Sequence, residues 1–261
     1  MSHSKTSGRT HQSTCRLLAS VPLDRGLCPR IGPDGVRTGE AVTARVVQLS
    51  RGALEAGALV RDPHGWTGLL VLGGMITVEI DCGRARTCWL IGEGDLLRPW
   101  EAQTNPVTQN ASWRVVSKSR VALLDAAFAE GAAAIPEMLS AITNHATQTT
   151  YWLLAQSLTA SLRTIEERLL LLFALLAERW GKVTPQGVRV ELPVTHDQLA
   201  RMCGARRQSV CSAMGILRQG GLLEPSSHQG WLLRPDRPAR TYGWSEDASW
   251  RHYAQAIGLR L

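Results

Sequence analysis

The stretch Thr195–Gly221, THDQLARMCGARRQSVCSAMGILRQGG, has apolar residues at helical spacing that is interrupted once and then resumes. The interruption falls at Met202–Ala205, and the pattern restarts behind a pair of arginines. Thr195, followed three residues later by Gln198, can cap the first helical segment. The spacing therefore predicts two short helices joined by a tight turn.

The residue types in this stretch suit a helix-turn-helix. Counted from His196, the fifth residue is Ala200, which lets two helices cross closely, and the ninth is Gly204, which can adopt the positive φ of a tight turn. Helices joined by a glycine turn occur in many folds, and an arginine pair is usually a solvated face. The segment Leu222–Leu233 is typical of a hairpin, which would supply the wing of a winged helix. This segment therefore favours a DNA-binding helix-turn-helix over an unrelated pair of helices.

The second helix is expected to begin near Arg206 and to present polar side chains away from Val210 and Ala213. Arginine can bind guanine through two hydrogen bonds, and glutamine can pair with adenine in the major groove. Hydroxyl and guanidinium groups beside them can contact phosphates. The predicted DNA-contacting residues are Thr195, His196, Arg206, Arg207, Gln208, Ser209 and Ser212.

Upstream of this stretch the sequence pattern changes once, from strand-like to helix-like. From Ala41 to about Asp125 it reads as short strands separated by Gly, Pro and Asp, which predicts an antiparallel sandwich or barrel with Gly73-Gly74 as a bend between consecutive strands. A long helix is predicted from Pro136, and a Thr164/Glu167 capping box begins another, nearly all apolar helix that ends at Gly181.

At this point the chain resembles the Crp/Fnr family of bacterial transcription regulators over about residues 16 to 235. The resemblance rests on LLASVPLDRGL, on GLLVLGGMITVEI with LIGEGDLL, on the long connecting helix, and on LPVTHDQLARMCGARRQSVCSAMGILRQGGLLE. It implies an α+β chain with an antiparallel, jelly-roll β-barrel of the cyclic-nucleotide-binding type, a connecting helix and a winged helix-turn-helix. The expected parts are a disordered tail at 1–14, an effector-type barrel at 15–135, a connecting and dimerisation helix at 136–163, the DNA-binding domain at 164–236 and a C-terminal extension at 237–261.

The resemblance also carries implications for function. Family members are homodimers that bind double-stranded DNA, and RNA polymerase is a further candidate partner. Arg207 matches the arginine that reads a guanine, Gln208 replaces the neighbouring glutamate, and Ser212 replaces a second base-contacting arginine, so the target sequence should differ from the usual one. The dimer rests mainly on the resemblance, because His145, Thr149 and Gln156 interrupt the apolar seam of the connecting helix, and a helix packed on its own barrel would show the same pattern.

The effector site departs from the family pattern. The positions that hold cyclic nucleotides correspond to Arg98-Pro99 and Asn110-Ala111, which lack the phosphate-binding arginine and the ribose-binding glutamate. Cys15 and Cys28 do not reproduce an iron–sulfur cluster motif, and His64 lies in a loop typical of an exposed histidine rather than of a haem ligand. We therefore expect no cofactor: neither cyclic AMP, nor haem, nor an iron–sulfur cluster.

Bulk properties bound the remaining alternatives. The net charge of +7 favours an anionic partner such as nucleic acid. The longest apolar run, Leu169–Ala177, is too short to cross a bilayer, and the polar N-terminus is not of signal-peptide type, so a cytoplasmic protein without a membrane partner is expected. The six cysteines are expected to be free thiols, with Cys203 and Cys211 in the core. No catalytic motif is present, so an enzyme is not expected; a small-molecule sensor with vestigial DNA binding is the alternative.

Overall fold

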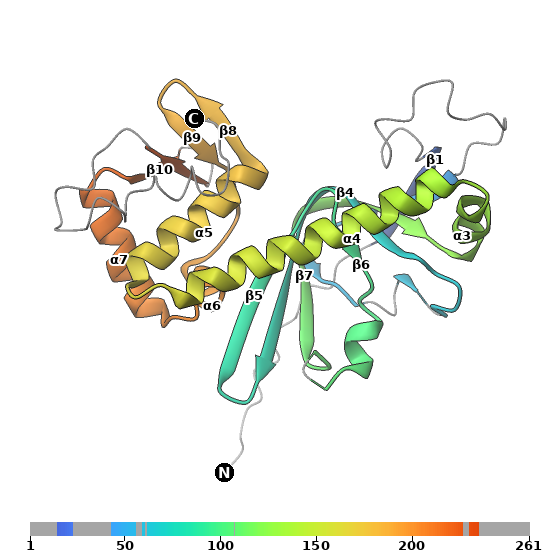
Figure 1. Cartoon of the computed structure of the whole chain (residues 1–261), viewed down its shortest axis with the longest axis horizontal. Coiled ribbons are helices and arrows are strands. Elements are labelled where there is room, and N and C mark those ends of the chain that lie inside the picture. The colour runs from blue at the N-terminus through green and yellow to red at the C-terminus, as the bar shows by residue number, and fades with distance from the viewer. Residues whose placement is uncertain are drawn as a thin grey trace, which may run out of the picture. The chain divides into compact units, whose positions relative to one another are not determined.

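The computed structural model describes residues 15–22, 43–55, 59–60, 62–106, 108–226 and 230–234 (Figure 1). The chain divides into two compact units. The first contains residues up to Ala85 together with Trp89–Thr150, and the second contains Arg86–Cys88 and the residues from Tyr151 onward. The predicted tail at 1–14 and the predicted extension at 237–261 lie outside the described residues.

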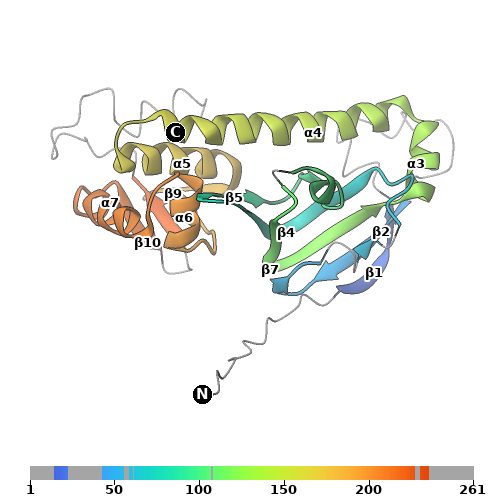
Figure 2. The same ribbon diagram turned by 90° about the horizontal axis from the view of Figure 1, so that it is seen from below.

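The first unit is built on one antiparallel seven-stranded sheet. Its strands are β1 (Cys15–Pro22), β2 (Thr43–Leu49), β3 (Gly52–Ala53), β4 (Gly68–Cys82), β5 (Ala85–Ile91), β6 (Leu96–Leu97) and β7 (Ala111–Leu124). The order is β1-β2-β7-β4-β5, with β3 paired to β7 and β6 paired to β4. Strongly bent strands give the sheet a curved, barrel-like form (Figure 2), but among the described residues no pairing closes it into a ring. The fold class predicted from the sequence is confirmed.

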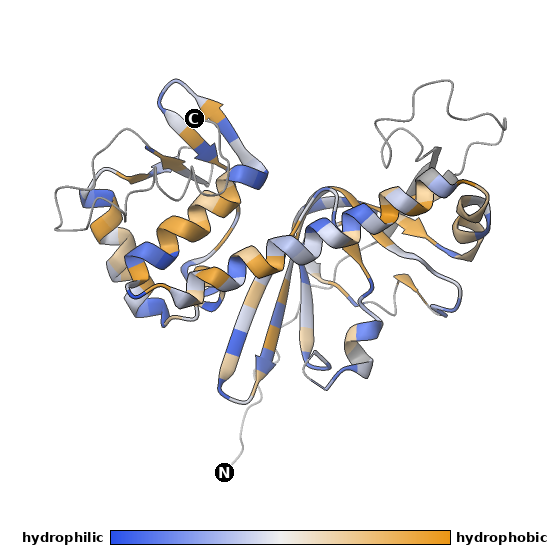
Figure 3. Ribbon diagram, viewed as in Figure 1, coloured by the Kyte–Doolittle hydropathy of each residue, from blue (hydrophilic) through white to orange (hydrophobic). Residues whose placement is uncertain are grey.

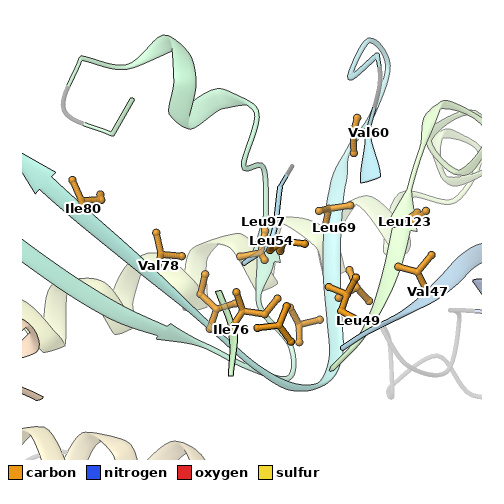
Figure 4. Packing of buried hydrophobic residues seen from close by; sticks show 14 residues of the cluster. Val47, Leu49, Leu54, Val60, Leu69, Ile76, Val78, Ile80, Leu97 and Leu123 are labelled. Carbon is orange, nitrogen blue, oxygen red and sulfur yellow. The ribbon is translucent and has the colours of Figure 1, made fainter. Parts of the chain in front are cut away.

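Apolar side chains cover both faces of this sheet and form two separate clusters. One cluster lies within the curve and includes Leu49, Leu69, Ile76 and Leu97 (Figure 4). The other includes Leu70 and Leu124 and packs against Phe128, from helix α3 (Ala126–Ala133), and Met138, from helix α4 (Pro136–Ser157). Since alternate residues of a strand face opposite sides, one sheet can bury both faces, which explains why these strands read as nearly continuous apolar runs.

The Gly73-Gly74 pair lies inside strand β4, so its prediction as a bend between consecutive strands is wrong. The register of β4 against β7 shifts on both sides of Gly73. Gly74 adopts a φ of +88°, and a Cβ atom there would collide with the backbone of Lys118 and Ser119. The Ser119 hydroxyl accepts a hydrogen bond from Met75 N at 3.0 Å and fills this irregularity. The pair is therefore a bulge that bends one long strand.

We expect Gly74→Ala to lower the free energy of unfolding by about 1–3 kcal/mol, because the methyl group both clashes and enforces a strained φ. Gly73→Ala is the matched control, since a Cβ atom at Gly73 meets nothing within 4 Å. Urea unfolding followed by tryptophan fluorescence measures both. Equal stabilities of the two variants would contradict this account of the bulge.

The second unit contains the end of α4 and all of the following elements. These are the 3-10 turn η2 (Leu158–Ser161), α5 (Ile165–Trp180), β8 (Gly181–Thr184), β9 (Gly187–Val190), α6 (His196–Met202), α7 (Arg207–Gln219), β10 (Leu223–Ser226) and β11 (Gly230–Leu233). The strands form a sheet in the order β10-β11-β9-β8. The connecting helix predicted for 136–163 ends earlier, at Ser157, and continues as the 3-10 turn.

Helix α5 is the apolar centre of this unit (Figure 3). Thr164 accepts a hydrogen bond from Glu167 N, and the Glu167 carboxylate accepts one from Thr164 N, so the predicted capping box is confirmed. Every residue from Leu169 to Ala177 is buried. None of the helices in the described part of the chain combines the length and the hydropathy needed to span a bilayer.

Candidate nucleic-acid interface

The helix-turn-helix forms where the sequence places it, with α6 and α7 joined at Cys203–Arg206. The Ala205 amide donates to Ala200 O at 2.8 Å and the Gly204 amide donates to Arg201 O at 3.4 Å, which is a Schellman motif. This motif requires a left-handed residue, and Gly204 supplies it with a φ of +61°. The corner between the two helices is thus determined by backbone hydrogen bonds and one glycine.

Two groups outside the corner hold its carbonyl oxygens. Arg168, in the first turns of α5, donates from Nη1 to Cys203 O at 3.2 Å and from Nε to Leu162 O at 2.9 Å. The buried Thr159 hydroxyl lies 3.5 Å from Met202 O. The end of α6 is therefore bonded both to η2 and to α5. A half-buried arginine in this role carries no sequence signal beyond its place in the helix.

The start of α7 presents a dense group of polar side chains. Arg206, Arg207, Gln208, Ser209 and Ser212 are all exposed, whereas the opposite side of the helix buries Val210, Ala213, Met214 and Leu217. Within the described part of the chain neither of the two arginines forms an ion pair. The structure therefore brings these five side chains, all predicted from the sequence, to one exposed surface.

The two predicted residues at the start of α6 have partners within the protein. The Thr195 hydroxyl accepts a hydrogen bond from Gln198 N at 3.2 Å, which confirms the predicted capping box. The His196 ring is half-buried and stacks on Trp231 of β11, with the ring centres 6.2 Å apart. His196 thus connects α6 to the wing.

Strands β10 and β11 form the hairpin predicted as a wing, and residues 227–229 at its tip lie outside the described residues. Trp231 also contacts Phe173 of α5 edge-on at 5.9 Å. Arg234 pairs with Glu224 across the hairpin at 2.8 Å. The wing is therefore fixed to the same core that holds α6. The strand β8, which pairs with β9, was not predicted.

Of the two cysteines predicted to lie in the core, one is buried and the other is exposed. Cys203 is buried as predicted, and burial raises the pKa of its thiol to about 12, against a smaller opposing effect of the Arg168 charge. Cys211 is exposed, on the same side of α7 as Arg207 and Gln208. Its residue type favours burial, and only the angular position in α7 shows where it lies.

The contacts of helix α4 explain why the polar residues His145, Thr149 and Gln156 interrupt its apolar pattern. In the first unit Met138 and Ile142 pack on the sheet, His145 Nδ1 lies 2.8 Å from Gly94 O, and the Thr149 hydroxyl donates to the buried carboxylate of Asp95 at 2.9 Å. In the second unit Trp152 stacks edge-on against Trp180, and Gln156 donates to Cys88 O at 3.0 Å. These residues are bonded within their own chain, so they are not the seam of a coiled coil.

Comparison with known proteins gives one match to a domain family and several matches to solved structures. A model of the Crp-like helix-turn-helix domain matches residues 167–239. A cysteine-to-serine variant of CprK in complex with OCPA is 12% identical, with a TM-score of 0.52 over 82% of this chain and 91% of its own. TTHA1359, a CRP/FNR-family transcriptional regulator from Thermus thermophilus, is 16% identical, with a TM-score of 0.50 over 74% of this chain and 90% of its own. No curated protein matches the chain.

A third solved structure has a similar fold. The c-di-GMP-responsive global regulator CLP from Xanthomonas campestris is 17% identical, with a TM-score of 0.50 over 73% of this chain and 94% of its own. At these identities the structural matches show the fold, and the domain match shows the type of helix-turn-helix. The solved structures thus support the fold that the resemblance implies, and the domain match shows a Crp-like helix-turn-helix over residues 167–239.

We expect Arg168→Met to lower the free energy of unfolding by about 1–3 kcal/mol, because two carbonyl oxygens lose a charged donor. The neighbouring exposed Arg163→Met should leave stability unchanged. Urea unfolding measures both variants. The salt dependence of DNA binding should be the same for Arg168→Met as for the unaltered protein. A shallower salt dependence would mean that Arg168 contacts phosphates and that the bonds to the corner are not its main role.

Proposed function

We propose that the protein binds a specific double-stranded DNA sequence by inserting α7 into the major groove. The observation that carries the proposal is the exposed group at the start of α7, in which Arg206 and Arg207 have no acidic partner among the described residues. Arg207 and Gln208 supply the donors and acceptors that read base edges, and Arg206 with Ser209 supplies phosphate contacts. The wing lies beside the same surface, because Trp231 is stacked on His196.

Arg207→Ala should weaken binding to the preferred sequence by about 1–3 kcal/mol and relax the preference at one base position, since it removes a two-pronged contact to guanine. Arg206→Ala is the matched comparison. It should weaken all sequences about equally and reduce the slope of log K against log salt by about 1. Selection from a random DNA pool, followed by gel-shift titration at several salt concentrations, measures both effects.

Two outcomes would count against this proposal. Failure of the unaltered protein to enrich any sequence would favour a sensor with vestigial DNA binding. Wild-type behaviour of both arginine variants, with enrichment intact, would mean that another surface of the protein reads the DNA.

The second part of the proposal is a homodimer formed through the outward face of α4. At about 100° per residue, Tyr151 and Leu154 fall on the side of the helix opposite Met138 and Gln156, and Leu139 lies at the edge of that side, about 60° from Leu154. The exposed fractions of Leu139, Tyr151 and Leu154 are 47%, 62% and 58%, and Leu158, which follows the helix, is 58% exposed. Large apolar side chains in one stripe indicate a protein contact, and a second copy of the same helix has the matching stripe. A dimer that binds two half-sites one helical turn apart needs its two recognition helices about 34 Å apart.

The double variant Leu154→Glu/Leu158→Glu should be monomeric, because carboxylates cannot be buried in the proposed contact without a large cost. Gln148→Glu, an exposed position of α4 outside the stripe, is the control and should remain dimeric. Analytical ultracentrifugation measures the mass, and circular dichroism checks that the helices persist. A folded dimeric double variant would show that the subunits meet elsewhere.

The effector-type unit is proposed to bind no cyclic nucleotide through the usual phosphate contact. Arg98, the cation at the nucleotide position, pairs with Glu101 at 3.0 Å, and its guanidinium lies 5.8 Å from the centre of the Trp100 ring. Asn110 is exposed and carries no charge. The exposed His64, whose amide donates to the Asp62 carboxylate, supports the expectation that no haem is bound. RNA polymerase remains a candidate partner of the DNA-bound protein.

A further inference from the structure

Cys211 occupies the middle of the exposed face of α7. It lies one turn after Arg207 and Gln208 and one turn before Gly215, and the buried residues of the helix point the other way. An exposed cysteine in this position is surrounded by the side chains proposed to read DNA. Neither the corner nor the core accounts for its presence there.

The neighbours of Cys211 make the centre of this face low and uncharged. Gly215 has no side chain, and a Cβ atom added there would meet nothing within 4 Å. Arg207 and the exposed Arg218 lie toward the two ends of the helix. A groove that receives α7 can therefore approach the helix most closely at Cys211 and Gly215, while the arginines contact its edges.

The thiol of Cys211 is held in place from outside its own helix. His196 Nδ1 lies 3.2 Å from Cys211 Sγ, and the other side of this contact is the stacking of His196 on Trp231. A side chain at the junction of α6, α7 and the wing loses little additional freedom on binding. The sulfur is weakly polar and behaves as a small apolar group, which suits contact with a methyl group better than a hydrogen bond.

We propose that Cys211 is a specificity-determining residue that packs its sulfur against the methyl group of a thymine in the major groove. This inference rests on the proposed DNA binding by α7 and adds one base preference to it. Among the four bases, thymine alone presents a methyl group in the major groove. Because the centre of the helix face is low, a larger residue at position 211 would hold the helix away from the bases.

The first test measures the reactivity of each thiol toward N-ethylmaleimide by mass spectrometry, with and without saturating selected DNA. Cys211 should react readily in the free protein and about tenfold or more slowly in the complex, because the bound duplex covers it. Cys82 is exposed on β4 and should react equally in both samples, and the buried Cys203 should react in neither. A gel shift run in parallel establishes that the complex has formed.

The second test replaces single thymines of the selected site by uracil, which lacks only the methyl group. The unaltered protein should lose about fourfold in affinity at one position. Cys211→Ser should show no loss there, while Cys82→Ser should keep the full loss. Equal reactivity of Cys211 in free and bound protein, or methyl discrimination unchanged in Cys211→Ser, would overturn the inference while leaving DNA binding intact. Absence of a shifted complex would instead remove the proposed function on which it rests.

Discussion

The recognition surface depends on the backbone corner between α6 and α7. Its two closing hydrogen bonds, from Gly204 to Arg201 O and from Ala205 to Ala200 O, require the left-handed conformation at Gly204. The direction of α7 follows from this corner, and with it the set of side chains that face outward. The bonds of Arg168 to Cys203 O and Leu162 O add constraints from α5 and η2. A small shift in this corner would displace the far end of α7 by much more.

Helix α4 has two different faces: one bonds to the protein's own sheet unit, and the other exposes apolar side chains. Its polar residues His145 and Thr149, which break a heptad, are the ones that bond to the Gly94–Asp95 turn. The apolar residues Tyr151 and Leu154 lie on the opposite side, with Leu139 at its edge, and all three have large exposed fractions. A helix whose one face is satisfied by the protein's own polar groups and whose other face exposes apolar surface has a free face of the kind that association covers. The pattern of heptads alone cannot assign either face.

Local chemistry accounts for what could be predicted from the sequence. The Thr164/Glu167 and Thr195/Gln198 capping boxes, the glycine corner and the wing hairpin each depend on residues within a few positions of one another, and the structure has all of them. The errors arise where distant residues decide. Whether Gly73-Gly74 ends a strand or bends it depends on Ser119 of β7. The exposure of Cys211 depends on the face of α7 that packs on α5 and α6, and the anchoring role of Trp231 depends on Phe173 and His196.

The electrostatic argument for DNA also changes once the partners of each cation are known. A net charge of +7 says nothing about location, and several basic side chains are occupied by acids: Arg45 by Asp125, Arg98 by Glu101, Arg201 by Asp197 and Arg234 by Glu224. A cation that already has a carboxylate partner gains less from a phosphate, because it must first give up that partner. Arg201 lies within the helix-turn-helix, but its ion pair with Asp197 removes it from the cations that are available to bind phosphate. Arg206 and Arg207 form no ion pair with any described residue, so they can neutralise phosphates and release counterions without such a loss. The position of these two arginines at the start of α7, rather than the total charge, is therefore what makes this surface suited to a duplex.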